Sequence, residues 1–99
     1  MINSKQRAYL RSLAAAEDTL IQIGKGGISE ALVAQVQQTL SARELVKGRV
    51  LESSLLTARE ACDALAERCR AEGVQVIGNC FVLYKRNEKQ PRIDIRTHK

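Results

Sequence analysis

Residues 19–29 have the sequence TLIQIGKGGIS, and this stretch decides the fold. The apolar run over residues 19–23 predicts a short strand, and the four residues after it form a glycine-rich loop. Ser29 is a preferred N-cap residue, so we expect a helix to begin directly after the loop. Glycine permits positive φ angles and close approach of the backbone to a ligand, and a helix N-terminus carries a partial positive charge. This strand, loop and helix predict a site for an anion such as phosphate.

The loop consists of Gly24, Lys25, Gly26 and Gly27, and Lys25 adds a full positive charge to the anion site. Gly24 and Gly27 also fit the G-x-x-G spacing with which KH-type RNA-binding domains clamp a nucleic-acid backbone. From four residues alone, a tight turn without a ligand is an equally good interpretation. The surrounding sequence has to decide between the two.

Apolar residues recur at helical spacing in three segments, which we expect to be helices: 4–16, 29 to 41 or 42, and 58 to about 72. Arg7 and Arg11 lie together on a polar side of the first helix. Thr57 and Glu60 have the spacing of a capping box, in which each side chain bonds the backbone of the other, so they predict the start of the third helix. Gly73 is expected to stop that helix.

Four shorter segments are expected to be strands: 19–23, 44–52, 74–77 and 80–85. Gly78 and Asn79 predict a type II′ turn, so the last two strands are antiparallel neighbours. The element order is therefore α-β-α-β-α-β-β, and we expect a single compact α/β domain over residues 1–86 with a mixed four-stranded sheet. Residues 87–99 read as a basic C-terminal tail, and His98, the only histidine, lies in it.

The second predicted strand carries two cations. Its alternation points Val46 and Val50 to one face of the sheet, and Lys47 and Arg49 to the other. Gly48 weakens the strand and suggests either a bulge or the close packing of a helix at that position.

The composition favours a cytoplasmic protein with an acidic partner. The 99 residues carry a formal net charge of +5, which suits nucleic acid, an anionic membrane surface or an acidic protein. No apolar run approaches the ~20 residues of a transmembrane helix, and the N-terminal residues lack the apolar core of a signal peptide, so we expect no membrane association. Three cysteines make a poor disulfide framework, and Cys62 and Cys69 fall on the apolar side of the third helix, where we expect core packing.

The sequence presents no recognisable catalytic constellation. The acidic residues Glu60, Asp63, Glu67 and Glu72 alternate with arginines and read as the solvated side of the third helix. The glycine loop lacks the spacing of a Walker A or dinucleotide-binding motif. We therefore expect the protein not to be an enzyme, and to have no metal, cofactor or small-molecule substrate.

Cations around the loop favour a nucleic-acid ligand. Lys25, Arg7, Arg11, Lys47 and Arg49 would form one phosphate-binding surface if the first helix and the second strand flank the loop. The chain has one Phe, two Tyr and no Trp, so stacking of bases on aromatic rings is expected to be minor. These observations predict recognition of RNA by its shape and backbone, with modest discrimination between sequences.

Six segments together resemble the CRM domain, the chloroplast RNA splicing and ribosome maturation family, in its bacterial stand-alone, YhbY-like form. They are KQR at 5–7, YLR at 9–11, LA at 13–14, IQIGKGGI at 21–28, ELVK at 44–47 and VQVIG at 74–78. The resemblance runs from about residue 2 to 86. It implies an α/β fold similar to the C-terminal domain of translation initiation factor three, a KH-like G-x-x-G loop, RNA binding, and association with precursors of the large ribosomal subunit.

Carried onto this chain, the resemblance implies that the family loop is Gly24 to Gly27 and that nearby cations contact RNA: Lys5, Arg7, Arg11, Lys25 and Lys47. Two positions depart from the family pattern. Gly48 stands where members usually have a β-branched residue, and Cys80 enters the last hairpin. Both departures concern packing and not the loop.

Two other functions remain open from the sequence. The basic surface could serve a protein-interaction adaptor that recognises an acidic partner. A duplex DNA-binding protein is the second alternative, although no helix with an evident groove-reading pattern is present in the sequence. In each case we expect a monomer.

Overall fold

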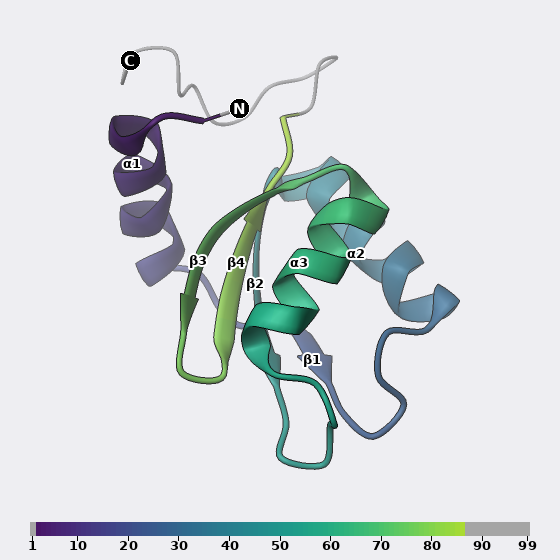
Figure 1. The fold of residues 1–99 in the computed structure, drawn as a ribbon. Helices are drawn as coiled ribbons and strands as arrows, with labels where there is room; N and C mark the ends of the chain where they lie inside the picture. Colours follow the sequence, from purple (N-terminus) through teal and green to yellow (C-terminus); the bar gives the residue numbers. More distant parts are fainter. Residues whose placement is uncertain (1, 87–99) are drawn as a thin grey trace.

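Three helices and four strands alternate in the predicted order α-β-α-β-α-β-β (Figure 1). The computed structural model describes residues 2–86, so the predicted tail with His98 lies outside the described residues. The elements are α1 (Ser4–Ala15), β1 (Ile21–Ile23), α2 (Glu30–Arg43), β2 (Leu45–Val50), α3 (Ala58–Cys69), β3 (Glu72–Ile77) and β4 (Cys80–Tyr84). Within residues 2–86, no helix is long and apolar enough to cross a lipid bilayer.

Side-chain caps set the helix starts. The Ser29 hydroxyl accepts a hydrogen bond of 3.1 Å from the Leu32 amide, which confirms the predicted N-cap of α2. The capping box of α3 is also confirmed, with Thr57 and Glu60 bonding each other's amides at 2.9 and 3.1 Å. Asn3 forms a similar box at the start of α1, which the sequence reading did not include.

The predicted end of the third helix is wrong. Helix α3 ends at Cys69 because Arg70 takes a left-handed conformation with φ of 55°, and the Ala71 amide then bonds the Ala66 carbonyl at 2.8 Å. Glu72 therefore belongs to β3 and not to the helix, and Gly73 does not act as the stop. Glycine is the usual residue at such a left-handed position, but here the residue is Arg70. Gly73 therefore predicted the helix end too late in the chain.

The four strands form the predicted mixed sheet, in the order β1-β2-β4-β3. Strand β1 runs parallel to β2, and the other two pairs are antiparallel. The turn between β3 and β4 has a positive φ at Gly78 and none at Asn79, as the predicted type II′ turn requires. Strand β3 is an outer edge of the sheet and carries a bulge between Gly73 and Gln75.

Helices cover the two faces of the sheet unequally. Helices α2 and α3 pack on one face over a core that includes Val46, Val50 and Phe81. Helix α1 packs on the other face with a smaller apolar cluster around Leu10 and Tyr84, near the start of β2. Considering residues 2–86 alone, the second face is therefore covered only in part (Figure 1).

Gly48 allows an aromatic ring to lie against the sheet. Its register partner on β4 is Phe81, and a Cβ built at Gly48 would lie 2.4 Å from the Phe81 Cζ atom. The sequence predicts a bulge or a closely packed helix at Gly48, and this prediction is wrong. The β2–β4 register runs without a break, and the group that lies close to Gly48 is the Phe81 ring. The predicted core positions Cys62 and Cys69 are confirmed as buried.

Candidate nucleic-acid interface

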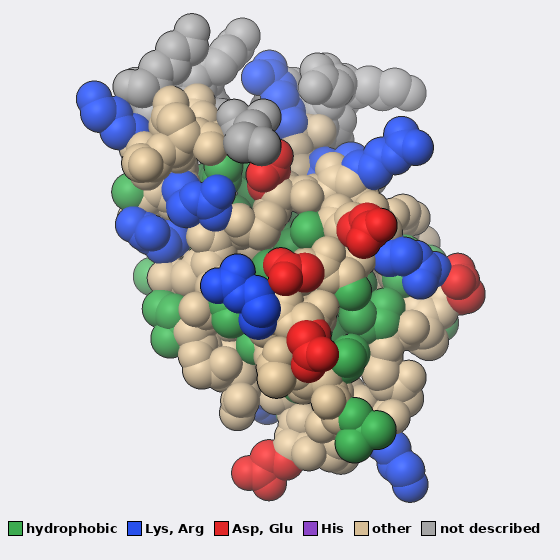
Figure 2. Space-filling view, in the orientation of Figure 1, with side chains coloured by type: hydrophobic (Ala, Val, Ile, Leu, Met, Phe, Trp, Pro, Cys, Tyr) green, Lys and Arg blue, Asp and Glu red, His purple; other side chains and the backbone are tan. Residues whose placement is uncertain are grey.

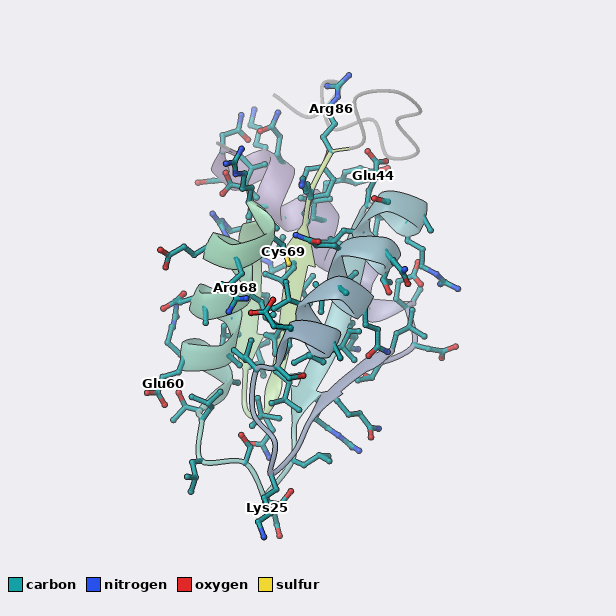
Figure 3. The ribbon with its side chains drawn as sticks, turned by 90° about the vertical axis from the view of Figure 1, so that its right-hand side faces the viewer. Lys25, Glu44, Glu60, Arg68, Cys69 and Arg86 are labelled. Carbon is teal, nitrogen blue, oxygen red and sulfur yellow. The ribbon has the colours of Figure 1, made fainter. Side chains whose placement is uncertain are left out.

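The glycine loop leaves the end of β1 as a tight turn. The Gly27 amide donates a hydrogen bond of 3.0 Å to the Gly24 carbonyl, and Gly27 has a φ of 64°, a value that favours glycine. Lys25 is exposed at the tip of the molecule, and its ammonium group points outward (Figure 3). The loop therefore presents a full positive charge on a segment whose backbone a ligand can approach closely.

A second loop lies beside the first. The Leu51 amide donates to the Ile23 carbonyl at 2.8 Å, and a Cβ at Gly24 would lie 3.4 Å from the Ser53 hydroxyl. This loop, residues 51–56, carries Leu55, whose side chain is 99 % exposed. The tip thus combines a cationic glycine loop with an exposed leucine.

The start of α2 already has a negative charge beside it. Glu30 is the first residue of the helix, and its carboxylate accepts a hydrogen bond of 2.7 Å from the Arg68 guanidinium of α3. An acidic residue in the first turn interacts favourably with the helix dipole, so it competes with an incoming phosphate. The loop amides and Lys25 are therefore better placed for an anion than the helix end itself.

The predicted cations fall into separate groups. Lys47 and Arg49 share the sheet face that α1 covers only in part, as predicted, and Arg49 pairs in register with Gln22 of β1. Lys5, on α1, is exposed. Helix α1 lies toward the end of the molecule opposite Lys25 (Figures 1 and 3). Helix α1 packs over the far end of the strands and does not flank the loop, so a single surface that includes its cations stays a prediction.

Arg7 bonds the edge of the sheet. Its guanidinium donates to the backbone carbonyl of Gly73 and, at 3.1 Å, to that of Val74. Both carbonyls belong to the bulged part of the edge strand β3. Arg7 therefore satisfies acceptors that an outer strand would otherwise leave open to another chain, and it ties α1 to the sheet.

Replacing Arg7 with alanine is expected to lower the free energy of unfolding by about 1–2 kcal/mol, because a charged donor bonds two carbonyls there. Arg11→Ala, on the same helix but exposed, is the matched control and should change stability by less than about 0.5 kcal/mol. Urea denaturation followed by circular dichroism measures both variants. Equal losses would show that Arg7 does not hold the helix to the sheet.

A groove of about 460 Å³ runs along the outer edge of β3 between α1 and α3. Three arginines line it, namely Arg7, Arg11 and Arg59. Figure 2 shows Lys and Arg side chains on the surface over α1 and α3, the two helices that border the groove. The sequence pattern predicts a solvated surface for the arginines of the third helix, and only the packing of α3 beside β3 brings Arg59 to the other two. Burial raises the pKa of the Cys62 thiol, which also lines the groove.

Aromatic side chains are unavailable for stacking on the sheet. Phe81 and Tyr84 are both buried, one in each apolar cluster, and Tyr9 on α1 is partly buried. Contacts with a nucleic acid would therefore depend on charge, backbone amides and aliphatic surface.

The fold and the loop define a small α/β domain of the CRM type. The family model of the CRS1 / YhbY (CRM) domain matches residues 2–85. The chain belongs to this family.

Curated relatives extend over almost the same length. The "Probable RNA-binding protein YqeI" of Bacillus subtilis is 36% identical over 95 residues, which cover 96% of this chain and 99% of the relative. An "RNA-binding protein" of Haemophilus influenzae is 28% identical over 88 residues, covering 89% of each chain. The solution structure of a hypothetical protein from Staphylococcus aureus is 42% identical with a TM-score of 0.78, covering 95% of this chain and 98% of that one.

Proposed function

We propose that this protein binds structured RNA mainly through the phosphate backbone, and that it acts in the cytoplasm as an assembly factor on precursor RNA of the large ribosomal subunit. The observation that carries the proposal is the exposed Lys25 on a glycine loop at the end of β1, where a Cβ built at the neighbouring Gly26 would meet nothing within 4 Å. Such a loop can hold a nucleic-acid backbone without reading bases.

Two features support RNA as the ligand, and a third supports the ribosomal role. The formal net charge is +5. Two of the curated relatives carry RNA binding in their names, and both match most of this chain. The resemblance to stand-alone bacterial CRM proteins supports the ribosomal role. The loop glycines, Lys25, Lys47 and Arg49 are proposed as the principal contacts, and Lys5, Arg7 and Arg11 as a second, more distant group.

Salt dependence of binding tests the proposal. We expect affinity for a structured fragment of large-subunit ribosomal RNA to fall about 10- to 100-fold between 50 and 200 mM salt, the loss that release of counterions from two to four phosphates produces. A DNA duplex of matched sequence and length is the control and should bind more weakly. Fluorescence anisotropy measures both. Salt-independent binding, or binding that does not exceed that of the DNA duplex, would contradict the proposal and favour an acidic protein partner or duplex DNA.

The ribosomal role has its own test. The protein should sediment with precursors of the large ribosomal subunit in a sucrose gradient of cell extract, and less with mature subunits. Equal amounts with precursors and with mature subunits, or recovery only in the light fractions, would contradict the role in assembly without contradicting RNA binding.

A further inference from the structure

Among residues 2–86, the sheet face that carries α1 is covered by that helix at one end only. Helix α1 packs over Leu45, Val74 and Tyr84, at the end where β2 begins. Toward the other end, the same face presents polar and partly exposed side chains, and we call this half the open sheet face. Its residues are Gln22 of β1, Lys47 and Arg49 of β2, Gln75 and Ile77 of β3, and Cys80 of β4.

A recess of about 240 Å³ lies in the open sheet face. Its lining residues come from three strands: Lys47, Gln75, Ile77, Cys80 and Val82. The strand register explains the grouping, because Val82 pairs with Lys47 on one side and with Gln75 on the other. Val82 also belongs to the apolar cluster under α1, so the recess adjoins the part of the sheet that this helix covers.

The lining matches the chemistry of a nucleobase. Ile77 provides most of the aliphatic surface, because it is 64 % exposed although it is a large apolar residue, whereas Val82 is only 3 % exposed. The Gln75 carboxamide can both donate and accept hydrogen bonds, which suits the polar edge of a base. Ligand pockets for whole drug-sized molecules are usually about 300–1,000 Å³, so this smaller recess fits a single ring system.

Cations lead from the recess to the glycine loop. Lys47 lines the recess, and Arg49, two residues further along β2, pairs with Cys80 on one side and with Gln22 on the other. Gln22 is followed by Ile23 and then by the loop. An RNA backbone held at the loop could therefore continue along β2 with positive charge beside it. The one charged residue among the five that line the recess is Lys47, which favours an anionic partner over a neutral or cationic one.

We propose that the open sheet face holds an unpaired nucleotide of the bound RNA, with its base in the recess and its flanking phosphates against Lys47 and Arg49. This inference rests on the proposed function. It adds a preference for RNA in which an unpaired nucleotide adjoins the structured part that the glycine loop holds. A base read by aliphatic contact and one carboxamide also accounts for binding without an exposed aromatic platform.

Cys80 provides a reporter in the recess itself. It is partly exposed, whereas Cys62 and Cys69 are buried and burial raises the pKa of both thiols. An alkylating reagent at neutral pH should therefore modify Cys80 first, because reaction needs an accessible thiolate. An RNA hairpin with an unpaired loop should slow that modification about tenfold. A fully paired RNA of equal length, whose backbone also reaches Lys47 and Arg49 beside Cys80, should bind and slow it much less. Mass spectrometry of the alkylated peptides measures the rates.

Binding is recorded by anisotropy in the same samples, so that the two proposals can fail separately. If the hairpin binds and Cys80 is modified at its free rate, the recess is not occupied and this inference is wrong while the proposed function stands. If neither RNA binds, both proposals are wrong. Slower modification of Cys80 at higher protein concentration without RNA would instead identify a second copy of the chain as the occupant and overturn the inference.

A substitution supplies an independent readout. Ile77→Glu places a negative charge beside the recess at an exposed position, so folding should be retained, and we expect the hairpin to bind about tenfold more weakly. Gln37→Glu adds the same charge to the exposed side of α2, on the other face of the sheet, and is the matched control. Affinity for fully paired RNA should change little in either variant. Equal effects of Ile77→Glu on paired and unpaired RNA would contradict a nucleotide in the recess.

Discussion

The double variant Lys25→Asp/Gly26→Asp is expected to bind RNA about 100-fold more weakly than the wild type while keeping its stability. Lysine to aspartate changes the loop by two units of charge, and the second aspartate adds a third. Each unit within contact of a phosphate is worth about 1 kcal/mol even in water, and about 1.4 kcal/mol corresponds to a factor of ten. A loss of this size follows only if the loop contacts the backbone directly.

The structure shows why these two positions suit the test. Lys25 is exposed, and a Cβ at Gly26 would meet nothing within 4 Å. Gly26 does not have a positive φ, whereas Gly27 does, so an aspartate at Gly27 would strain the turn and confuse binding with folding. Urea denaturation should give the double variant and the wild type the same free energy of unfolding within about 0.5 kcal/mol.

Net charge needs its own control. The triple variant Gln35→Glu/Gln37→Glu/Gln38→Glu also lowers the charge by three units, but on exposed positions of α2. Anisotropy at two salt concentrations should show a small loss for this variant and a reduced salt dependence only for the loop variant. Equal losses in the two variants would mean that overall charge, and not the loop, determines the affinity.

Replacing Gly48 with alanine is expected to lower the free energy of unfolding by about 3 kcal/mol. The added Cβ would lie 2.4 Å from Cζ of Phe81 and 2.8–2.9 Å from two further ring atoms. Phe81 is fully buried between β2 and the helices α2 and α3, so the ring has little room to move away. This overlap should outweigh the gain of up to about 1 kcal/mol that alanine usually brings over glycine within a strand.

Two further variants isolate the cause. Gly26→Ala, in open space and without a positive φ, should change the unfolding free energy by less than about 0.5 kcal/mol. Phe81→Leu removes the ring atoms that the new methyl group would meet. The double variant Gly48→Ala/Phe81→Leu should therefore lose about 2 kcal/mol less unfolding free energy than the sum of the losses in the two single variants. Strict additivity in urea denaturation would show that the ring is not what excludes a side chain at Gly48.

Much of the local structure could be read from the sequence. Ser29 and the Thr57–Glu60 pair set helix starts through bonds that span three residues, and Gly78 sets the turn between two adjacent strands. The order of helices and strands, and the exposed lysine between glycines, follow from the same short-range patterns. The end of α3 at Cys69 does not follow from these patterns, because Arg70 adopts a left-handed conformation that is usual for glycine.

The tertiary structure alone decided which distant residues meet. Arg7 bonds carbonyls 66 and 67 residues away, so a residue predicted to contact RNA also holds α1 to the edge of the sheet. The ring of Phe81 explains Gly48, and the short reach of α1 leaves the recess around Lys47 uncovered. Hydrophobic periodicity shows that a residue faces a core but not which strand or helix lies opposite, because that depends on the strand order and on packing between elements far apart in the chain. The sequence by itself therefore determined the elements and the loop, and the packing of those elements determined which cations can act together.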